Sequence, residues 1–359
     1  MNNASDSPLI SAVIPTLNEA SFIDRCLRSV FSTDPVPGGL EVLVIDGMST
    51  DSTRQILKDW CQKQPNLRVL DNPLGIVPCA MNIGIRAARG QWIVRLDAHS
   101  EYPADYFVRC LDTSRRTSAD NVGGAVISIA LDEGVQGKIV RALTTHWFGV
   151  GNSAPRTKTA EGWADTVPFG CYRREVFARI GLYDERLVRN QDYELNRRLI
   201  KFGGRIWYDP LIRIFYYNRS SLRELFRQAF RTGQWNPWMW IVAPYSFAWR
   251  HAVPMAFVAT LLCMYSLFLV VPALAITVLN LMLWPYAGLA IVASWQQSSR
   301  YGGWLFIPLP FCFLSYHIVY GLGGLWGLCL LLGRRSPVQV PSPTRRNVDQ
   351  APLPGRTIR

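Results

Sequence analysis

The most restrictive feature of this sequence is a long C-terminal region that is almost free of charge. Between Ala252 and Gly333 the only charged residue is Arg300. A helix of about 20 apolar residues is long enough to cross the hydrocarbon core of a bilayer. The region contains three apolar stretches of this kind, at residues 252–271, 273–293 and 304–332. We therefore predict an enzyme-sized module followed by a membrane region.

The orientation of this region is left open by the sequence. Three spans would place the arginines that follow residue 333 on the opposite side of the membrane from the N-terminal module, whereas basic segments prefer the cytoplasmic side. Either one span is re-entrant or the last consists of two half-length segments. The N-terminus lacks the basic and then apolar pattern of a signal peptide, so we expect the N-terminal module in the cytoplasm.

The distribution of charge indicates lipid rather than nucleic acid as a partner. The net charge is +12, and arginines cluster at residues 219–250 and after residue 333. Basic residues that flank apolar spans suit anionic lipid headgroups, so we expect no nucleic-acid partner. The expected segments are a catalytic domain at 1–215, an amphipathic interfacial segment at 216–250, the membrane region at 251–333 and a basic disordered tail at 334–359.

The N-terminal module alternates predicted strands and helices. Short apolar runs rich in β-branched residues lie at 10–16, 40–47, 67–72 and 91–98, and helical patterns separate them. This order predicts an α/β fold with a parallel sheet that is covered by helices on both faces. Ligands of such sheets bind beyond the carboxyl ends of the strands. The polar residues expected at that edge are Asn18, Glu19, Asp46, Asp97 and His99.

The stretch Asp97-Ala98-His99 has two interpretations. A polar turn is the simpler one, because Asp and Ser are common where strands end. The chain, however, has no G-x-G-x-x-G after the first predicted strand and no P-loop motif. A nucleotide diphosphate held without such a loop needs another source of positive charge. A divalent metal ion on Asp97 and His99 would supply it.

Four motifs in the module resemble the family 2 glycosyltransferases of the GT-A fold. They occur in the family's order and spacing, and they are VIPTLNE (13–19), VIDGMSTDST (44–53), AMNIGIRAARG (80–90) and VRLDAH (94–99). The resemblance covers about residues 9–240 and is greatest to the membrane-bound glucosyltransferases of succinoglycan-type exopolysaccharide biosynthesis. It implies a mostly parallel sheet with helices on both faces, followed by an interfacial helix and C-terminal transmembrane helices.

The resemblance implies a donor site for a UDP-sugar. The residues that would bind the nucleoside are Pro15, Thr16 and Glu19, with Asp46 bonded to the uracil or the ribose. Asp97 and His99 stand at the position of the family's D-x-D motif, which would hold a divalent metal ion and the diphosphate. Histidine replaces the second aspartate, and imidazole suits Mn²⁺ better than Mg²⁺, which favours oxygen ligands.

The segment RNQDYELNRRLI (189–200) resembles the acceptor side of the family's site. The family has Glu-Asp where this chain has Gln191-Asp192, and Asp192 is our candidate general base. An inverting transferase needs such a group to take the proton from the attacking sugar hydroxyl. Asp192 and Glu194 would also suit the first turn of a helix. We expect Glu194 to support the acceptor or the fold.

Residues 220–235 have the pattern of a basic amphipathic helix. Ser221 and Glu224 are spaced as a capping box. The basic residues that recur every fourth position beside an apolar face are Arg223, Arg227 and Arg231. This pattern is typical of a helix in the bilayer interface, although an ordinary helix packed on the module shares it. The residues that the resemblance places over the diphosphate and the acceptor are Gln228, Arg231 and Trp235.

These features predict an inverting glycosyltransferase that is a multi-pass protein of a bacterial inner membrane, with its catalytic domain in the cytoplasm. The resemblance implies transfer of a hexose, with glucose as the first candidate, from a UDP-sugar. The acceptor would be a polyprenyl-diphosphate-linked oligosaccharide in exopolysaccharide biosynthesis. The partners would thus be the UDP-sugar, the lipid-linked acceptor and membrane lipids.

Three other functions fit parts of the sequence. A polyprenyl-phosphate sugar synthase uses an acceptor that is already ionised and needs no general base. A processive polysaccharide synthase carries Q-x-x-R-W where this chain has RTGQW (231–235). A membrane-anchored binding protein with a degenerate site would have no reason to keep both Asp97 and Asp192. The sequence leaves the sugar, the linkage, the acceptor and the oligomeric state open.

Overall fold

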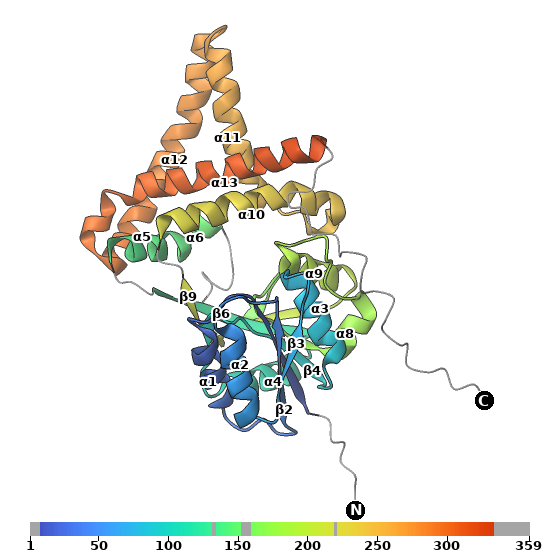
Figure 1. The fold of residues 1–359 in the computed structure, drawn as a ribbon. Coiled ribbons are helices and arrows are strands. Elements are labelled where there is room, and N and C mark those ends of the chain that lie inside the picture. Colours follow the sequence, from blue (N-terminus) through green and yellow to red (C-terminus); the bar gives the residue numbers. More distant parts are fainter. Residues whose placement is uncertain (1–7, 131–133, 152–158, 219–220, 334–359) are drawn as a thin grey trace, which may run out of the picture.

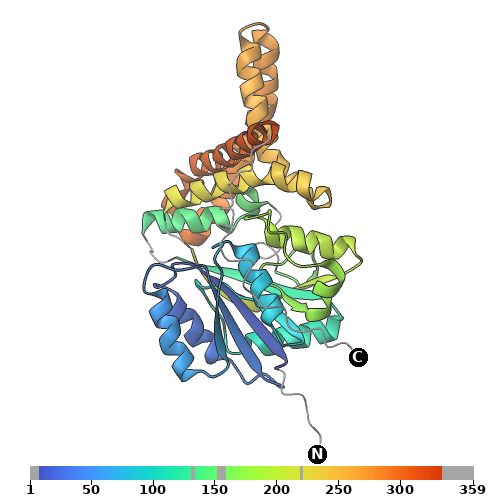
Figure 2. The same cartoon turned by 45° about the vertical axis from the view of Figure 1, so that its right-hand side comes forward.

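A computed structural model describes residues 8–130, 134–151, 159–218 and 221–333 of the chain. Figure 1 shows an α/β module that contains the N-terminal strands and, above it, a layer of long helices from the C-terminal part. Two of these long helices stand away from the rest as a hairpin, which is also clear from the second view in Figure 2.

The α/β module is built on one mixed sheet. Its first four strands are β1 (Ile10–Thr16), β2 (Leu40–Asp46), β3 (Leu67–Asp71) and β4 (Trp92–Arg95), and they pair in parallel. The others are β5 (Ser100–Glu101), β6 (Asn121–Ala130), β7 (Gly162–Trp163), β8 (Cys171–Arg173) and β9 (Ile206–Asn218). The order is β3-β2-β1-β4-β8-β6-β9-β5, with β7 paired to β9. Because β8 runs antiparallel to β4 and β6, a parallel half is followed by a mixed half.

Helices cover both faces of the sheet, as the sequence predicts. One face carries α1 (Ile23–Phe31), α2 (Thr53–Lys63) and α4 (Tyr106–Thr117). The other face carries α3 (Val77–Ala87), α8 (Arg174–Ile180) and α9 (Gln191–Lys201). Alternate residues of β1 divide between the two cores, since Ala12 and Ile14 face the first and Val13 faces the second. Burial on both faces explains why the central strands are apolar throughout.

Two short helices leave the sheet and join the helical layer. They are α5 (Val135–Thr144) and α6 (Trp147–Val150). Ile139 and Leu143 of α5 pack in one cluster with Leu309 and Phe313 of the last helix. The α/β module is thus attached to the helical layer by residues from the middle of its own sequence.

The helical layer contains α10 (Leu222–Val242), α11 (Trp249–Phe268), α12 (Pro272–Tyr301) and α13 (Leu309–Leu332). Short 3-10 turns precede α11, at Pro244–Ser246, and α13, at Gly303–Phe306. Within the described residues, α11, α12 and α13 are the three helices whose length and composition would let them cross a membrane. The expected boundary at residue 215 falls inside β9, which continues to Asn218.

The start of α10 corrects one sequence prediction. Ser221 is the N-cap residue, but its side chain makes no capping hydrogen bond, so the capping box expected with Glu224 is not formed. The backbone N–H of Leu222 donates instead to the side-chain oxygen of Gln136 at 3.3 Å. Gln136 belongs to α5, a helix that the sequence analysis did not predict, and this partner from outside the helix takes the place of the local cap.

A buried carboxylate holds the amino ends of β1, β2 and β4 together. The side chain of Glu41 is 1% exposed. Its Oε1 accepts hydrogen bonds from the Ser11 hydroxyl and from the backbone N–H of Arg89, both at 2.6 Å, and its Oε2 accepts from Nε of Arg89 at 3.0 Å. Burial raises the pKa of Glu41, but these hydrogen bonds outweigh burial and hold the pKa below its usual value.

We expect Glu41→Gln to lower the stability of the protein by about 1–3 kcal/mol, because the Ser11 hydroxyl and the N–H groups of Arg89 lose the ionised carboxylate that accepts their hydrogen bonds. The depressed pKa means that ionised Glu41 stabilises the fold above the unfolded-state pKa of about 4.3, and that this contribution is lost as the pH falls through the folded-state value. The melting temperature of the detergent-solubilised protein should therefore fall less steeply with acidification in Glu41→Gln than in the parent. Glu175→Gln, at an exposed position, should behave like the parent, and an unchanged melting temperature of Glu41→Gln at neutral pH would contradict the argument.

Candidate active site

The carboxyl ends of β1, β2 and β4 carry the predicted donor-site residues. The three strands are neighbours in the sheet, so the loops that follow them meet at one edge. Two of these loops are joined by hydrogen bonds. The N–H of Asn18 donates to the Ser49 hydroxyl at 2.8 Å, the N–H of Thr50 donates to the side-chain oxygen of Asn18 at 2.8 Å, and the N–H of Glu19 donates to the Thr53 hydroxyl at 2.9 Å. This pairing fixes the position of Glu19 at the edge.

Asp46 lies at this edge but beneath its surface. Its side chain is fully buried, and its oxygens accept hydrogen bonds from the Ser49 hydroxyl at 2.5 Å and from Nε of Arg54 at 2.7 Å. Thr16 is also buried, and its hydroxyl donates to the carbonyl of Ile14. Pro15 is partly buried. A direct bond from Asp46 to a base or a ribose therefore stays a prediction, and the Arg54 guanidinium is the more exposed group at that point.

His99 is held between carboxylates and a phenol. Its Nδ1 lies 2.8 Å from Oδ1 of Asp97 and 3.4 Å from Oε1 of Glu19, and its Nε2 lies 2.7 Å from the hydroxyl of Tyr216 on β9. Burial lowers the pKa of the imidazole, but the Asp97 carboxylate and the hydrogen bonds to Asp97 and Glu19 outweigh burial and raise the pKa to about 12. In this arrangement both nitrogens of the ring have protein partners.

The residues around His99 suit a divalent metal ion in kind but not in their present arrangement. Two carboxylates and an imidazole are ligands that Mn²⁺ accepts, and the side chains of Asp97 and Glu19 are partly exposed, at 19% and 17%. Within the described residues, however, no group of three or more His, Cys, Asp or Glu side chains has the geometry of a metal site. A metal ion at this position would require a neutral imidazole and the release of one of its ring nitrogens from its present partner.

Arg95 is a site residue that the sequence analysis missed. It ends β4, two positions before Asp97, and its side chain is only 8% exposed. Its Nη1 lies 3.6 Å from Oδ2 of Asp192, and its guanidinium lies over the ring of Phe169. Among the described residues, Nε and Nη1 of Arg95 have no hydrogen-bond partner. The signal in the sequence was a single arginine at the end of an otherwise apolar strand.

The electrostatics of Arg95 follow from this burial. Burial is the largest single influence and lowers the pKa of the guanidinium, but the Asp192 and Asp97 carboxylates and the nearby tyrosines together outweigh burial and raise the pKa above its usual value. A buried guanidinium whose N–H groups lack acceptors lowers the stability of the fold unless anions lie close to it. Arg95 therefore links β4, which leads into the predicted metal site, to the start of α9, which carries the predicted base.

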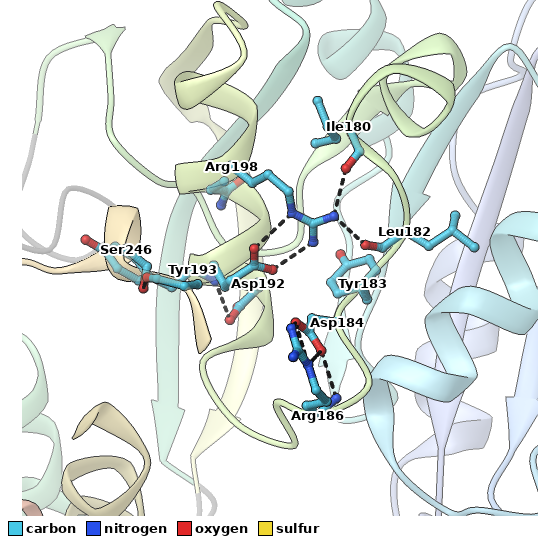
Figure 3. A network of polar contacts seen from close by, with 12 residues as sticks. Ile180, Leu182, Tyr183, Asp184, Arg186, Asp192, Tyr193, Arg198 and Ser246 are labelled. Atoms are coloured by element: carbon cyan, nitrogen blue, oxygen red, sulfur yellow. Dashed lines mark hydrogen bonds and ion pairs between the residues drawn. The ribbon is translucent and has the colours of Figure 1, made fainter. Parts of the chain in front are cut away.

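Asp192 and Glu194 have different roles in the first turn of α9. The side chain of Asp192 is 36% exposed and accepts a hydrogen bond from the backbone N–H of Tyr193. Glu194 is fully buried, makes two hydrogen bonds with Arg198 at 2.9 and 2.8 Å, and accepts another from the hydroxyl of Tyr245. Figure 3 shows that Arg198 also reaches the carbonyls of Ile180 and Leu182. Glu194 thus anchors α9, whereas the Asp192 carboxylate is partly exposed.

A cavity of about 410 Å³ lies between the sheet edge and α10. His99 and Tyr216 line it from the sheet side. The charged and polar residues of α10 that line it are Glu224, Arg227, Gln228 and Arg231, and Arg189, which precedes α9, also lines it. Trp235 is not among the lining residues, because it packs at 2% exposure with Leu187, Tyr193 and Met239. The structure therefore brings Gln228 and Arg231 to the cavity and places Trp235 in a hydrophobic cluster beside α9.

Known proteins resemble this chain along most of its length. The profile of the family described as "Glycosyl transferase family 2" matches residues 11–181. The succinoglycan biosynthesis protein ExoA of Rhizobium meliloti is 35% identical over 232 residues, which are 64% of this chain and 69% of that protein. A dolichyl N-acetyl-alpha-D-glucosaminyl phosphate 3-beta-D-2,3-diacetamido-2,3-dideoxy-beta-D-glucuronosyltransferase of Methanococcus voltae is 26% identical over 328 residues, or 89% of this chain and 97% of its own length.

A solved structure supports the fold. The mannosyltransferase PcManGT of Pyrobaculum calidifontis, in complex with GDP-Man and Mn²⁺, superimposes with a TM-score of 0.55 at 19% identity and covers 90% of this chain and 88% of its own. Three observations indicate the same family and fold. They are the four sequence motifs, the mixed α/β sheet and the similarity to these relatives. The chain belongs to glycosyltransferase family 2 and is a glycosyltransferase of the GT-A fold.

Proposed function

We propose that this enzyme transfers a hexose, with glucose as the first candidate, from a UDP-sugar to a lipid-linked oligosaccharide, with inversion of the anomeric carbon. The observation that carries the proposal is the cavity between the sheet edge and α10, because His99 of the donor side and the arginines of α10 line the same space. The names of two relatives, one in succinoglycan biosynthesis and one that acts on a dolichyl-linked sugar, support exopolysaccharide or lipid-linked glycan synthesis. Family membership removes the alternative of a non-catalytic binding protein.

The chemistry would be a single displacement. Asp192 takes the proton of the acceptor hydroxyl, the freed oxygen attacks the anomeric carbon, and the electrons of the broken bond pass to the UDP oxygen. Arg95 lies 3.6 Å from the Asp192 carboxylate and would fix its position. Because Glu194 is fully buried on Arg198, it is not a competing base. Catalysis in this scheme depends on positioning and charge and needs no covalent intermediate.

The departing diphosphate needs positive charge. A divalent metal ion would supply it as a Lewis acid, and Asp97, His99 and Glu19 are the residues that would hold the ion. A mannosyltransferase with the same fold is known in complex with Mn²⁺ and a nucleotide sugar. Arg231 and Arg227 face the same cavity and would add fixed positive charge for the diphosphate of the donor or of the lipid. The catalytic domain would lie at the cytoplasmic face of a bacterial inner membrane.

One observation also favours a polyprenyl-phosphate sugar synthase. The arginines of the cavity would bind the ionised phosphate of such an acceptor as well as they bind a lipid diphosphate. That acceptor has no proton to lose, so the two functions differ in their need for Asp192. The partial exposure of Asp192 beside Arg95 supports the oligosaccharide acceptor, because a sugar hydroxyl needs a base within reach.

The overall proposal is tested by incubating membranes that contain the enzyme with labelled nucleotide sugars and following the label into the lipid fraction. We expect one UDP-hexose to label the lipids. Excess chelator should stop the transfer, and Mn²⁺ should restore it at least as well as Mg²⁺ because histidine replaces an oxygen ligand. Transfer that continues in chelator would exclude the metal, and a lipid fraction that no nucleotide sugar labels would exclude the function.

We expect Asp192→Asn to reduce kcat by about 10²–10⁴-fold, equivalent to roughly 3–5 kcal/mol of barrier, because the amide cannot accept the proton. The affinity for the UDP-sugar and the melting temperature should change little, since the side chain is partly exposed and would act on the acceptor in the proposed scheme. Glu194→Gln is the matched control. It should lower the melting temperature, because the amide weakens the buried pair with Arg198, and the protein that remains folded should be active.

Arg95 offers a second check on the base. If Arg95 acts by positioning Asp192, Arg95→Met should lower kcat in the parent enzyme but have no further effect in the Asp192→Asn background. Independent losses in the double variant would give Arg95 a separate role. If Asp192→Asn turns over normally, the acceptor is an ionised phosphate and the synthase function replaces the proposal.

The cavity predicts different effects for the arginines of α10. Arg227→Gln and Arg231→Gln should raise the KM for the lipid-linked acceptor, because both side chains line the cavity. Arg223→Gln is the matched control, since Arg223 is exposed on the same helix but does not line the cavity. Steady-state kinetics with a fixed concentration of UDP-sugar would measure the change. Equal effects at all three positions would indicate general attraction to the membrane surface rather than binding in the cavity.

A further inference from the structure

Three helices qualify as membrane spans by composition, but they are not arranged alike. Helices α11 and α12 form a hairpin that stands away from the rest of the protein, whereas α13 runs across the base of this hairpin alongside α10 (Figures 1 and 2). Composition cannot distinguish a helix that crosses the bilayer from an apolar helix that lies along its surface. The contacts of α13 with its neighbouring helices can distinguish these two arrangements.

Glycines bring α13 into direct backbone contact with α10. A Cβ atom on Gly323 would lie 2.1 Å from the carbonyl oxygen of Phe230, and one on Gly327 would lie 2.2 Å from that of Gln234. In the other direction, a Cβ atom on Gly233 would lie 2.1 Å from the carbonyl oxygen of Tyr320. Side chains leave no room for such an approach, so the two helices must lie side by side over this length. Whatever depth α10 has in the membrane, the middle of α13 shares it.

The depth of α10 is limited by its charges. Arg223, Arg227 and Arg231 lie on exposed positions of this helix, and the last two face the cavity above the sheet edge. A charged side chain in the hydrocarbon core is strongly disfavoured. Helix α10 therefore lies outside the core, at the level of the headgroups, and α13 lies there with it. The Nε2 atom of His317 in α13 also bonds the carbonyl of Phe148 in α6 at 2.9 Å, which ties α13 to a second element of the α/β module.

The free face of α13 is apolar, as an interfacial helix requires. Gly323 and Gly327 pack on α10. The large apolar side chains that are exposed on the helix include Phe311 (69%), Leu322 (42%), Trp326 (51%) and Leu332 (78%), with Ser315 and Cys329 exposed between them. An apolar stripe with an aromatic residue on a helix that lies parallel to the membrane is buried at the boundary of headgroups and acyl chains. Together α10 and α13 form a layer whose polar side faces the cavity and whose apolar side faces lipid.

We propose that the α11–α12 hairpin alone enters the hydrocarbon core, and that α13 lies in the interface as the outer member of a two-helix layer with α10. A Cβ atom on Gly321 of α13 would lie 2.2 Å from the carbonyl oxygen of Pro254 and 2.5 Å from the side chain of Val258, so the part of α11 that projects beyond α13 runs from residue 259 to Phe268. At 1.5 Å per residue this part is about 15 Å long, which lets the hairpin enter the core of about 30 Å without crossing it. The exposed hairpin tip contains Leu269 and Val270 and carries no charge. The chain then leaves α13 at Gly333 on the same side as the α/β module, and the conflict between three spans and the positive-inside bias disappears.

The side on which α13 ends can be measured in sealed vesicles. Cys61, which is exposed on the α/β module, reports the side of that module, and the other exposed or partly exposed cysteines, Cys263, Cys312 and Cys329, are changed to Ala. In a second variant Cys61 is also replaced and Gly333→Cys is introduced. We expect a membrane-impermeant maleimide to label both variants from the same side. Labelling of Gly333→Cys from the opposite side only would overturn the proposal.

The depth of α13 is measured with nitroxide labels at two matched positions. Leu322 in α13 and Leu262 in α11 are both exposed leucines, at 42% and 53%. We expect the label at Leu322→Cys to be shallower, and thus more accessible to a water-soluble relaxing agent and less accessible to oxygen, than the label at Leu262→Cys. Equal depth at the two positions would show that α13 dips into the core and would also overturn the proposal. Neither measurement requires turnover, so both stand whatever the donor and acceptor of the enzyme are.

Discussion

The buried guanidinium of Arg95 is the interaction on which the arrangement of the active site depends. A cation at 8% exposure loses most of its hydration, and only nearby anions make this tolerable. Asp192 is the carboxylate 3.6 Å away, so the start of α9 must stay against the end of β4. Two positions later β4 leads into Asp97. The donor and acceptor sides of the proposed reaction are thereby joined through one side chain rather than through a flexible connection.

Helix α10 imposes a second constraint, because its two faces have opposite requirements. The apparent free energy of inserting a helix into a membrane rises by about 2.5–3.5 kcal/mol for an arginine at its centre, so three arginines raise it by on the order of 10 kcal/mol. That is comparable to the whole stability of a typical domain. The glycine contacts with α13 allow no separation of the two helices. Charge on one face and close packing on the other thus determine the depth of both helices.

Some of this could be predicted from the sequence, and the misses have physical causes. The four parallel strands and the edge that carries Asp97 and His99 follow from alternating patterns, which are local. The pairing of Arg95 with Asp192 depends on the packing of α9 against β4, and no local pattern contains it. The capping box predicted for α10 is wrong for the same reason, because the acceptor for the first N–H of this helix is Gln136, which is distant in sequence. Hydropathy identifies α13 as a possible span, whereas the packing on α10 from which we infer an interfacial position joins segments that are distant in sequence.

The two constraints explain why a transferase of this design would work at a membrane surface. The cavity has one wall at the sheet edge, where His99 and Tyr216 lie, and the other on α10. If α10 and α13 form one layer at the headgroups, as we propose, this cavity lies at the depth of a lipid phosphate. An acceptor anchored in the bilayer could then reach Asp192 while its hydrocarbon chain stays in the membrane.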